Sequence, residues 1–251
     1  SVTFILISLS IVTLAYCLPQ DEQVVSGSAT FDRSTSDTLN INTPSDKLIV
    51  NYSSFDIASQ ETVNFNQPSS SAVALNRVTE GANPTQILGS LNANGRIFII
   101  NHNGVLFSQG SRVDAAAIVA STLDIRNGDF LAGKYNFFKN GENAYIINQG
   151  NITVRNGGYA VLLSAAVDNQ FEIHADLGTV VLASGEKITL SLDDMNDISV
   201  VIDEGVKTEV FGPNGEKVTN AVKNSGLISA NGGKVILTAK VLNNVFDYAV
   251  N

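Results

Sequence analysis

The chain has 251 residues, of which 44% are apolar, and 24 acidic against 15 basic residues give it a formal net charge of −9. This length allows one sizeable core, and the apolar content excludes an intrinsically disordered protein. Because nucleic acid and anionic membranes are bound through clustered basic residues, the acidic balance argues against both as the main partner.

The first segment, residues 2–17 (VTFILISLSIVTLAYC), is apolar and uncharged, and polar residues follow it. It is shorter than the roughly 20 residues that span a bilayer, and it is typical of the apolar region of a secretory signal peptide. We therefore predict a signal peptide over residues 1–17, without its basic start, and an exported domain over residues 18–251. A buried N-terminal helix, a membrane anchor and, from LAYC, a lipoprotein signal are the alternatives. Cys17 is the only cysteine in the chain, so no disulfide can form within it.

The segment after the signal peptide, residues 26–82, alternates short apolar runs with Asn, Ser, Thr, Asp and Pro. This pattern predicts short strands separated by turns. Residues 114–123 (DAAAIVASTL) are compatible with one short helix or with a strand. No stretch keeps the 3.6-residue apolar period of a helix over several turns, so the sequence favours an all-β fold.

One pattern then occurs three times, and it opens with Asn148, Asn169 and Asn224. An isoleucine stands four residues after each of these asparagines, at Ile152, Ile173 and Ile228. A glycine-containing turn and a second apolar run complete each copy. A fainter copy at residues 89–100 extends the pattern upstream to about residue 86.

Such a repeat predicts one coil of a solenoid per copy, with two short strands joined at a glycine turn. A single coil cannot bury its apolar side, whereas coils stacked about 4.8 Å apart share parallel β-pairing and a core. We expect the asparagines to lie in register and to bond through their amides, and the isoleucines to fill the shared interior. We expect the glycines to supply positive φ angles at the corners. The predicted fold is a right-handed parallel β-helix, because parallel β connections prefer that hand.

Two irregularities stand out in the repeat. Only 21 residues separate Asn148 from Asn169, whereas 55 separate Asn169 from Asn224, and the added residues 186–219 alternate apolar and polar positions. We predict that they form extra-helical hairpin strands. The outward positions of the second strand are also apolar, at Val161, Val181 and Ile236, so we expect this insertion or the N-terminal strands to cover them.

The C-terminal residues DYAVN resemble the AYIIN that opens the first copy. We therefore expect another coil to begin at Asn251 and the domain to continue beyond it.

Several motifs of the chain resemble a known family. VNFNQPSSSAVALNRV, NPTQILGSLNANGRIFIINHNGVLF, RVDAAAIVASTLDI and DLGTVVLASG occur in this order. They are similar to the amino-terminal secretion domain of filamentous haemagglutinin-type exoproteins, the secreted partners of two-partner secretion in Gram-negative bacteria. The resemblance covers about residues 26–251 and implies a right-handed parallel β-helix with an N-terminal cap and extra-helical β-hairpins.

The resemblance also implies a function. A domain of this kind is exported to the periplasm, where an outer-membrane β-barrel transporter recognises it through periplasmic domains. The transporter then threads it to the cell surface or the medium, where it seeds folding of the long β-helix behind it. Host-cell glycans or receptors are expected as ligands of the downstream remainder, which is an adhesin, a cytolysin or a contact-dependent toxin.

The family's Asn-Pro-Asn-Gly motif corresponds to Asn101, His102, Asn103 and Gly104, with histidine in place of proline. The resemblance implies that these residues form a turn, contact the transporter, or do both. Asn-Gly favours a tight turn, and a proline would have preset its φ angle, so the turn is expected to be less rigid here. A second family motif, Asn-Pro-Asn-Leu, has no clear match, and FNQPSSS occupies the comparable region.

The sequence shows no catalytic, metal or cofactor motif, and we predict that the protein is not an enzyme. His174 is expected on the surface, because Thr153 and Ser229 hold the same repeat position. The acidic run at residues 193–197 (DDMND) lacks the spacing of a calcium loop. The alternative functions are an adhesin module that binds carbohydrate or a receptor by itself, and a β-helix polysaccharide lyase or hydrolase.

Overall fold

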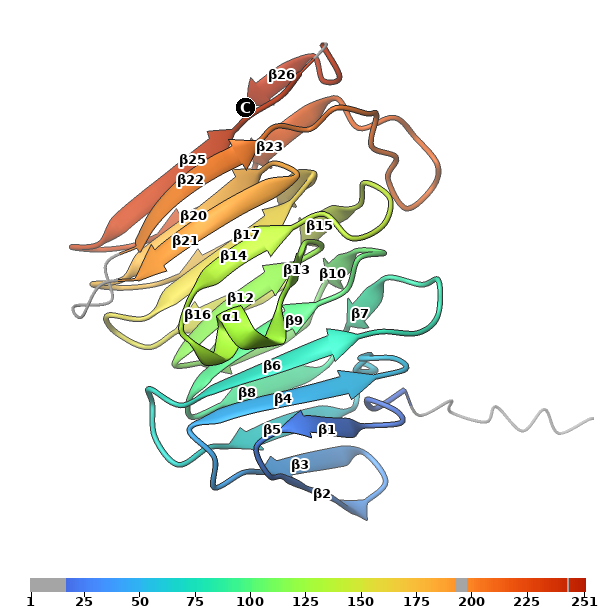
Figure 1. Ribbon diagram of the computed structural model, residues 1–251, viewed down its shortest axis with the longest axis vertical. Helices are drawn as coiled ribbons and strands as arrows, with labels where there is room; N and C mark the ends of the chain where they lie inside the picture. Colours follow the sequence, from blue (N-terminus) through green and yellow to red (C-terminus); the bar gives the residue numbers. More distant parts are fainter. Residues whose placement is uncertain (1–16, 193–197, 243) are drawn as a thin grey trace, which may run out of the picture.

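The computed structural model describes residues 17–192, 198–242 and 244–251, which form a stack of β-coils from the N-terminal strands to the C-terminal ones (Figure 1). The predicted signal peptide, except for Cys17, and the acidic run at residues 193–197 lie outside the described residues. Within the described ranges, no helix is long and apolar enough to cross a membrane.

Three long sheets form the sides of the stack, here called sheets 1, 2 and 3. The strands of sheet 1, in spatial order, are β1 (Gln23–Ser26), β4 (Lys47–Tyr52), β6 (Val73–Val78), β9 (Arg96–Ile100), β12 (Ala117–Ser121), β17 (Tyr159–Ser164), β20 (Thr179–Ser184) and β25 (Lys234–Ala239). Those of sheet 2 are β2 (Thr30–Thr35), β3 (Thr38–Asn42), β5 (Thr62–Asn66), β8 (Ser90–Ala93), β11 (Arg112–Ala115), β16 (Asn151–Val154), β19 (Glu172–His174) and β24 (Leu227–Ser229). Those of sheet 3 are β7 (Thr85–Ile87), β10 (Val105–Phe107), β15 (Tyr145–Asn148), β18 (Ala166–Asn169), β23 (Asn220–Asn224) and β26 (Tyr248–Val250).

Each coil takes one strand from sheet 3, then one from sheet 2, then one from sheet 1, as β15, β16 and β17 do. Neighbouring coils pair in parallel, and like residues stand opposite like residues. Because side chains alternate along a strand, this register places one apolar column inside the helix and the next one outside. The predicted parallel β-helix is confirmed.

The coils begin earlier than the repeat pattern indicated. Upstream of residue 86, β3 already pairs in parallel with β5, and β4 with β6. These coils have no strand in sheet 3, which is where the repeat asparagines of the later copies lie. At the N-terminal end, β1 and β2 pair antiparallel with β4 and β3 and close the first coil, which confirms a cap.

Residues 114–123 belong to β11 and β12, so the helical alternative is wrong for this segment. One short helix, α1 (Asn127–Leu131), lies instead in a first insertion between β12 and β15, which the sequence analysis did not identify. This insertion also contains β13 (Asp124–Ile125) and β14 (Tyr135–Phe138).

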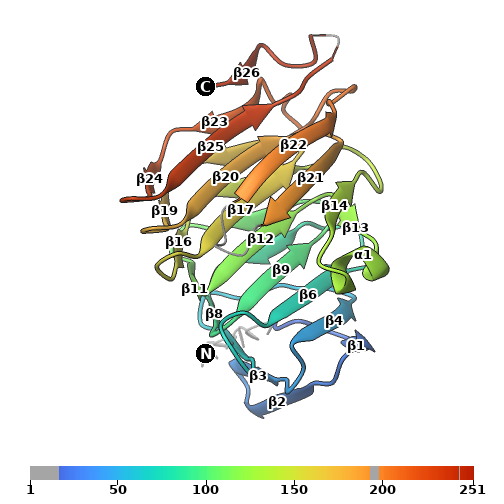
Figure 2. The same ribbon diagram turned by 60° about the vertical axis from the view of Figure 1, so that its left-hand side comes forward.

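The second insertion forms β21 (Lys187–Leu192) and β22 (Ile198–Glu204), as predicted for extra-helical strands. Strands β13, β14, β21 and β22 make one antiparallel sheet, here called the cover sheet. Figure 2 shows β21 and β22 lying across β17 and β20.

The cover sheet buries the outward apolar column of sheet 1. Val161 and Val181 are fully buried and Ile236 is partly buried, in one cluster with residues from both insertions. The cover side chains of this cluster include Phe130, Tyr135, Phe137, Ile188, Leu190 and Ile198. The expectation that the insertion covers these positions is confirmed, whereas the N-terminal strands lie in sheets 1 and 2 and do not form the cover.

The corner glycines differ from the expectation. Gly157 and Gly232 have positive φ angles, but in the second copy it is Leu177 that takes this conformation, at φ 55°. Gly178 is required for a different reason, since a Cβ atom there would lie 2.0 Å from the Gly158 carbonyl oxygen. The glycine column therefore permits close stacking of the coils.

Candidate functional site

The Asn-His-Asn-Gly turn, residues 101–104, joins β9 to β10 where the chain passes from sheet 1 to sheet 3. The Gly104 N–H donates to the Asn101 carbonyl oxygen at 3.1 Å, which closes a four-residue turn. The Asn103 N–H donates to the Asn101 side-chain oxygen at 2.9 Å, which adds an Asx turn. The turn therefore forms with histidine in place of the family's proline.

Asn101 anchors this turn to the preceding coil. Its side chain is 1% exposed, and its Nδ2 donates to the Asn83 carbonyl oxygen at 3.0 Å and to Thr85 Oγ1 at 3.2 Å. Its backbone N–H donates to the Ser121 carbonyl oxygen of the following coil. Asn101 therefore shapes the turn from within and is not available to a partner of the folded domain.

Gly104 allows the turn to lie against its neighbours. Its φ angle is +129°, and a Cβ atom would stand 3.2 Å from Pro84 Cβ and 3.2 Å from the Tyr145 carbonyl oxygen. Its carbonyl oxygen accepts a hydrogen bond from the Thr85 N–H at 3.0 Å. A larger residue at this position would push the strands of sheet 3 apart.

His102 and Asn103 are the half-buried members of the turn. Asn103 Nδ2 donates to the Gly81 carbonyl oxygen at 3.3 Å, and the His102 ring lies beside Gly141 in the loop that leads to β15. His102 also lines a surface hollow with Arg77, Asp124 and other residues. These two side chains are the parts of the motif that a partner can reach.

Arg77, which the sequence analysis missed, joins the coils to the first insertion beside this hollow. Its side chain donates to Asp124 Oδ1 at 2.8 Å, to Asn127 Oδ1 at 2.9 Å and to the Ile125 carbonyl oxygen at 2.6 Å. The only feature of the sequence that could have pointed to Arg77 is its charge within the otherwise mostly apolar strand β6. Because Arg77 is 9% exposed, these contacts fix the start of the cover relative to the turn.

The segment in place of the second family motif is a tightly bonded corner between β5 and β6. Gln67 exchanges two hydrogen bonds of 2.7 Å with the Asn94 side chain of the next coil. The side-chain Nε2 of Gln67 donates to the carbonyl oxygens of Ala72 at 3.0 Å and Arg96 at 3.1 Å. This corner therefore links consecutive coils through side-chain amides.

The three repeat asparagines lie one above another inside sheet 3. Asn148 Nδ2 donates to Asn169 Oδ1 at 2.7 Å, and Asn169 Nδ2 donates to Asn224 Oδ1 at 2.7 Å. Asn148 and Asn169 are fully buried. The isoleucines that follow them also align, since Ile152 pairs with Ile173 and Ile173 pairs with Ile228. Ile152 and Ile173 are fully buried, and Ile228 packs partly buried against the same core.

A second asparagine column, which the sequence analysis missed, lies on the outward face of sheet 2. Asn64 Nδ2 donates to Asn40 Oδ1 and Asn92 Nδ2 to Asn64 Oδ1, both at 2.9 Å. Its sequence signal is the recurring Asn-x-Asn of LNIN, VNFN and LNAN. His174 lies on the same face, in register with Thr153 and Ser229, as the repeat predicted.

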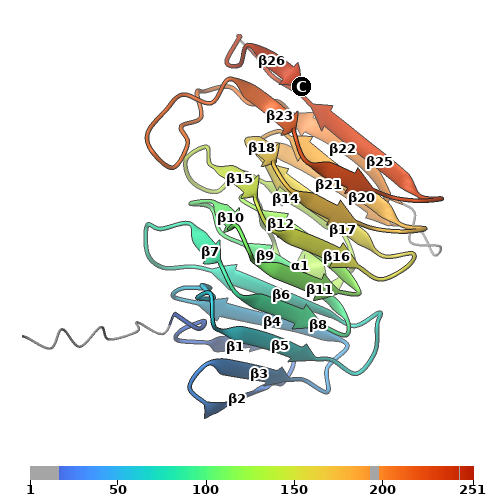
Figure 3. The same cartoon turned by 180° about the vertical axis from the view of Figure 1, so that it is seen from behind.

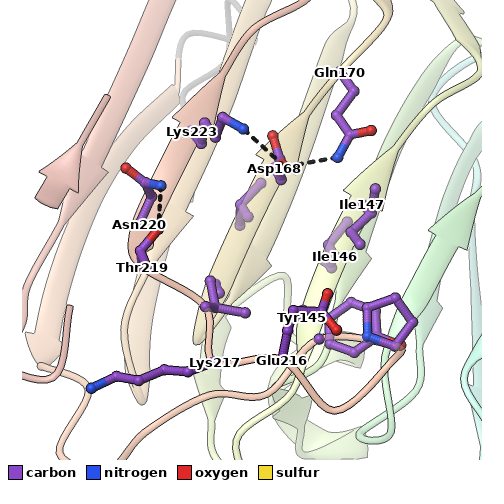
Figure 4. Close-up of a pocket in the computed structure, with 15 residues that line it drawn as sticks. Tyr145, Ile146, Ile147, Asp168, Gln170, Glu216, Lys217, Thr219, Asn220 and Lys223 are labelled. Carbon is purple, nitrogen blue, oxygen red and sulfur yellow. Dashed lines mark hydrogen bonds and ion pairs between the residues drawn. The ribbon is translucent and has the colours of Figure 1, made fainter. Parts of the chain in front are cut away.

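A groove lies between the outer face of sheet 3 and the loop of residues 205–219, which projects from that side in Figure 3. Tyr145 and Ile147 line it together with Asp168 and Lys223 (Figure 4). Asp168 Oδ2 accepts from Gln170 at 2.8 Å and lies 3.8 Å from Lys223 Nζ. Asp168 Oδ1 is buried without a hydrogen-bond partner among the described residues.

Among the residues that the structure describes, no group of three or more His, Cys, Asp and Glu side chains is placed to hold a metal ion. The acidic run at residues 193–197, considered above as a cation site, lies outside them.

Comparisons with known proteins agree with this architecture. The family model of the TPS secretion domain matches residues 15–251. A heme/hemopexin-binding protein of Haemophilus influenzae strain Rd is 34% identical over 233 residues, which cover 89% of this chain and 24% of that protein. A second heme/hemopexin-binding protein of Haemophilus influenzae is 33% identical over 255 residues, with 92% and 26% covered. The chain thus spans about a quarter of the length of these relatives.

The crystal structure of the HMW1 secretion domain from Haemophilus influenzae is similar to this fold, with a TM-score of 0.73 at 28% identity. The alignment covers 92% of this chain and 62% of that one. The family match, the identity to the relatives and the shared fold all extend over nearly the whole chain. The chain therefore belongs to the family of TPS secretion domains, which direct exoproteins across the outer membrane to the cell surface or the medium.

Proposed function

We propose that this chain is the secretion-targeting domain of a larger exoprotein. An outer-membrane β-barrel transporter recognises this domain through the transporter's own periplasmic domains. The observation that carries the proposal is the match of the TPS secretion domain to residues 15–251. TPS domains are recognised by outer-membrane transporters, and the proposal is that such a transporter recognises this chain. The activity of the exoprotein as a whole, including any binding of host glycans or receptors, belongs to regions outside this chain.

Within this function we propose that the Asn-His-Asn-Gly turn has two roles, divided by burial. Asn101 and Gly104 are buried and form the turn, whereas His102 and Asn103 are half-buried and reach the surface. Their side chains offer an amide and an imidazole, which both donate and accept hydrogen bonds. The transporter contact is therefore assigned to His102 and Asn103.

The experiment compares Asn103→Ala with Asn101→Ala in the full-length exoprotein, expressed with its transporter. Replacing a contact residue at the centre of an interface costs more than about 1 kcal/mol, or about fivefold in affinity. We expect Asn103→Ala to lower binding to the periplasmic domains and the secreted fraction while the thermal unfolding of the domain is unchanged. Asn101→Ala is expected to lower both secretion and stability.

Asn156→Ala is the matched control, because Asn156 is an exposed asparagine in another turn of the same domain. It should bind and be secreted like the unchanged protein. Normal secretion and binding of the double variant His102→Ala/Asn103→Ala would refute a contact role for the turn and leave it a structural one.

We further propose that the folded coils nucleate folding of the exoprotein outside the cell. The parallel pairing of successive coils supports this role, because each formed strand, such as β20, offers an edge on which the next one, β25, pairs in parallel. A following coil that stacks there gains parallel pairing and apolar burial without first building a nucleus.

A further inference from the structure

One buried carboxylate of this domain has no cation beside it. Glu61 is 2% exposed and stands just before β5. Its Oε2 accepts the Ala58 N–H at 2.7 Å, and its Oε1 accepts the Cys17 N–H at 2.8 Å. No lysine, arginine or histidine of the described chain forms an ion pair with it. A buried charge is costly without a partner of opposite sign. A cation in place of one of the two N–H donors would therefore stabilise the Glu61 carboxylate.

The surroundings of Cys17 add to this preference. Burial raises the pKa of Asp56 although its carboxylate accepts the Gln86 N–H at 2.7 Å, and the charge of Glu61 raises it further. Desolvation, followed by the charges of Glu61 and Asp56, likewise raises the pKa of the Cys17 thiol. The backbone nitrogen of Cys17 thus lies in the negative field of two carboxylates.

The chain that follows Cys17 is fixed in the fold. Leu18 is 4% exposed and belongs to the interior core. Gln20 pairs with the loop after β4, where its N–H donates to the Ser54 carbonyl oxygen at 3.0 Å. Arg33 of β2 donates to the Pro19 carbonyl oxygen and bonds Glu22, both at 2.6 Å. Contacts with the fold therefore hold the backbone of residues 17–22 in place, including the backbone nitrogen of Cys17.

We propose that Glu61 is the receptor for the α-ammonium group that removal of the signal peptide frees, and that the cut falls at one of the two peptide bonds of Cys17. Hydrolysis adds one water to the bond, so the leaving segment ends in a carboxylate and the domain begins with an amine that is protonated at neutral pH. The proposal rests on the predicted signal peptide and is independent of how the transporter recognises the domain.

A cut at either bond leaves an ammonium group at the position of the Cys17 nitrogen or within about 4 Å of it. A cut before Cys17 converts the nitrogen that now lies 2.8 Å from Glu61 Oε1 into an ammonium group. A cut after Cys17 removes the Cys17 nitrogen and makes the Leu18 nitrogen the ammonium group. Three bonds separate the two nitrogens along the chain, so the Leu18 ammonium lies no more than about 4 Å from the position that the Cys17 nitrogen held. The precursor has only an amide there, so the complete ion pair forms only after processing.

The first test identifies the start of the exported domain by intact mass and N-terminal sequencing of the protein recovered from the medium. We expect a free amine at Cys17 or at Leu18. A start at any other residue would overturn the proposal, and so would an acylated or lipid-modified N-terminus, because neither provides the cation.

The second test measures the coupling between Glu61 and the amine. The folding equilibrium constants of the processed protein and of Glu61→Gln are compared with the α-amine free and after it has been selectively acetylated. A hydrogen bond to a charged group contributes more than a neutral one, so Glu61→Gln should lower the constant about tenfold more when the amine is free. Glu80→Gln, at an exposed carboxylate, is the control and should show no such difference.

Equal effects of Glu61→Gln in the free and acetylated forms would show that no ion pair exists. If Glu61→Gln does not fold, the acetylation rate of the unchanged protein decides the matter. The proposal requires the α-amine to react at least about tenfold more slowly in the folded than in the unfolded state, because an amine held in an ion pair is kept protonated. Equal rates would reject it.

Discussion

At the scale of single residues, burial decides how much a hydrogen bond between two asparagine side chains contributes to stability. Asn148 and Asn169 bond through their amides in a fully buried column, whereas Asn66 Nδ2 donates in the same way to Asn42 Oδ1 at the ends of β3 and β5, beside the outer column, where Asn66 is exposed. Water can replace a lost partner only on the exposed face. The inner column therefore fixes the register of the coils, and the exposed bond between Asn66 and Asn42 adds little to stability.

We predict that Asn169→Ala lowers the free energy of unfolding by about 3 kcal/mol, because it leaves a buried donor of Asn148 and an acceptor of Asn224 without their partner. Asn66→Ala, which removes an exposed amide bond, is the control and should cost less than about 0.5 kcal/mol. Urea denaturation of both variants measures the difference. Equal costs would mean that the inner column does not set the register.

At the scale of elements, the domain depends on two insertions that meet on one face of the helix. They leave the stack after β12 and after β20, which are both strands of sheet 1, and β14 of the first pairs with β21 of the second. Arg77 bonds the first insertion to the coils. Together the insertions convert the apolar outer face of sheet 1 into a second core.

We predict that Val181→Asp destabilises the domain by more than about 4 kcal/mol, because its carboxylate would be buried between sheet 1 and the cover sheet without a cation. Val201→Asp on β22 is the matched control, since Val201 is 55% exposed on the outer side of the cover. Its effect should stay within about 0.5 kcal/mol. Thermal unfolding distinguishes the two, and a stable Val181→Asp would mean that the cover sheet opens readily.

At the scale of the whole molecule, the fold is a stack in which every coil contacts mainly its neighbours. All pairings between the coils are parallel and join residues that are far apart in sequence, which makes folding slow. The chain has a single cysteine, so no disulfide within it resists threading. These properties suit a domain that crosses the outer membrane before it folds and then folds coil by coil.

If folding outside the cell biases the movement outward, weaker coils should slow secretion. Ile152→Ala and Ile173→Ala each remove a fully buried side chain and should cost about 2–5 kcal/mol. We predict that the double variant appears at the cell surface more slowly at an equal level of precursor, as followed by pulse-chase labelling. Thr153→Ala, at an outward position of the same coil, is the control. An unchanged secretion rate for the double variant would show that folding outside the cell does not drive transport.

The sequence alone was sufficient for the repeating part of the fold. The offsets from Asn148 to Ile152 and from Asn169 to Ile173 recur in each copy because each coil offers the same face to its neighbour. The alternation of residues 186–219 likewise indicated strands outside the helix, and the apolar Val181 indicated that something covers it. The Asn-His-Asn-Gly motif was found by its resemblance to a family.

Only the tertiary structure decided which segments meet. The early coils at β3 and β5 lack the repeat asparagines, and the first insertion lies between the faint upstream copy and the first clear one, where the period is not defined. The contacts of Arg77 with Asp124 and of Glu61 with Cys17 join residues more than 40 positions apart. The alternation of apolar and polar residues predicts which face of a strand is buried, because that pattern is local in the sequence. It does not predict which segment packs against the buried face, since that depends on how distant segments pack in space.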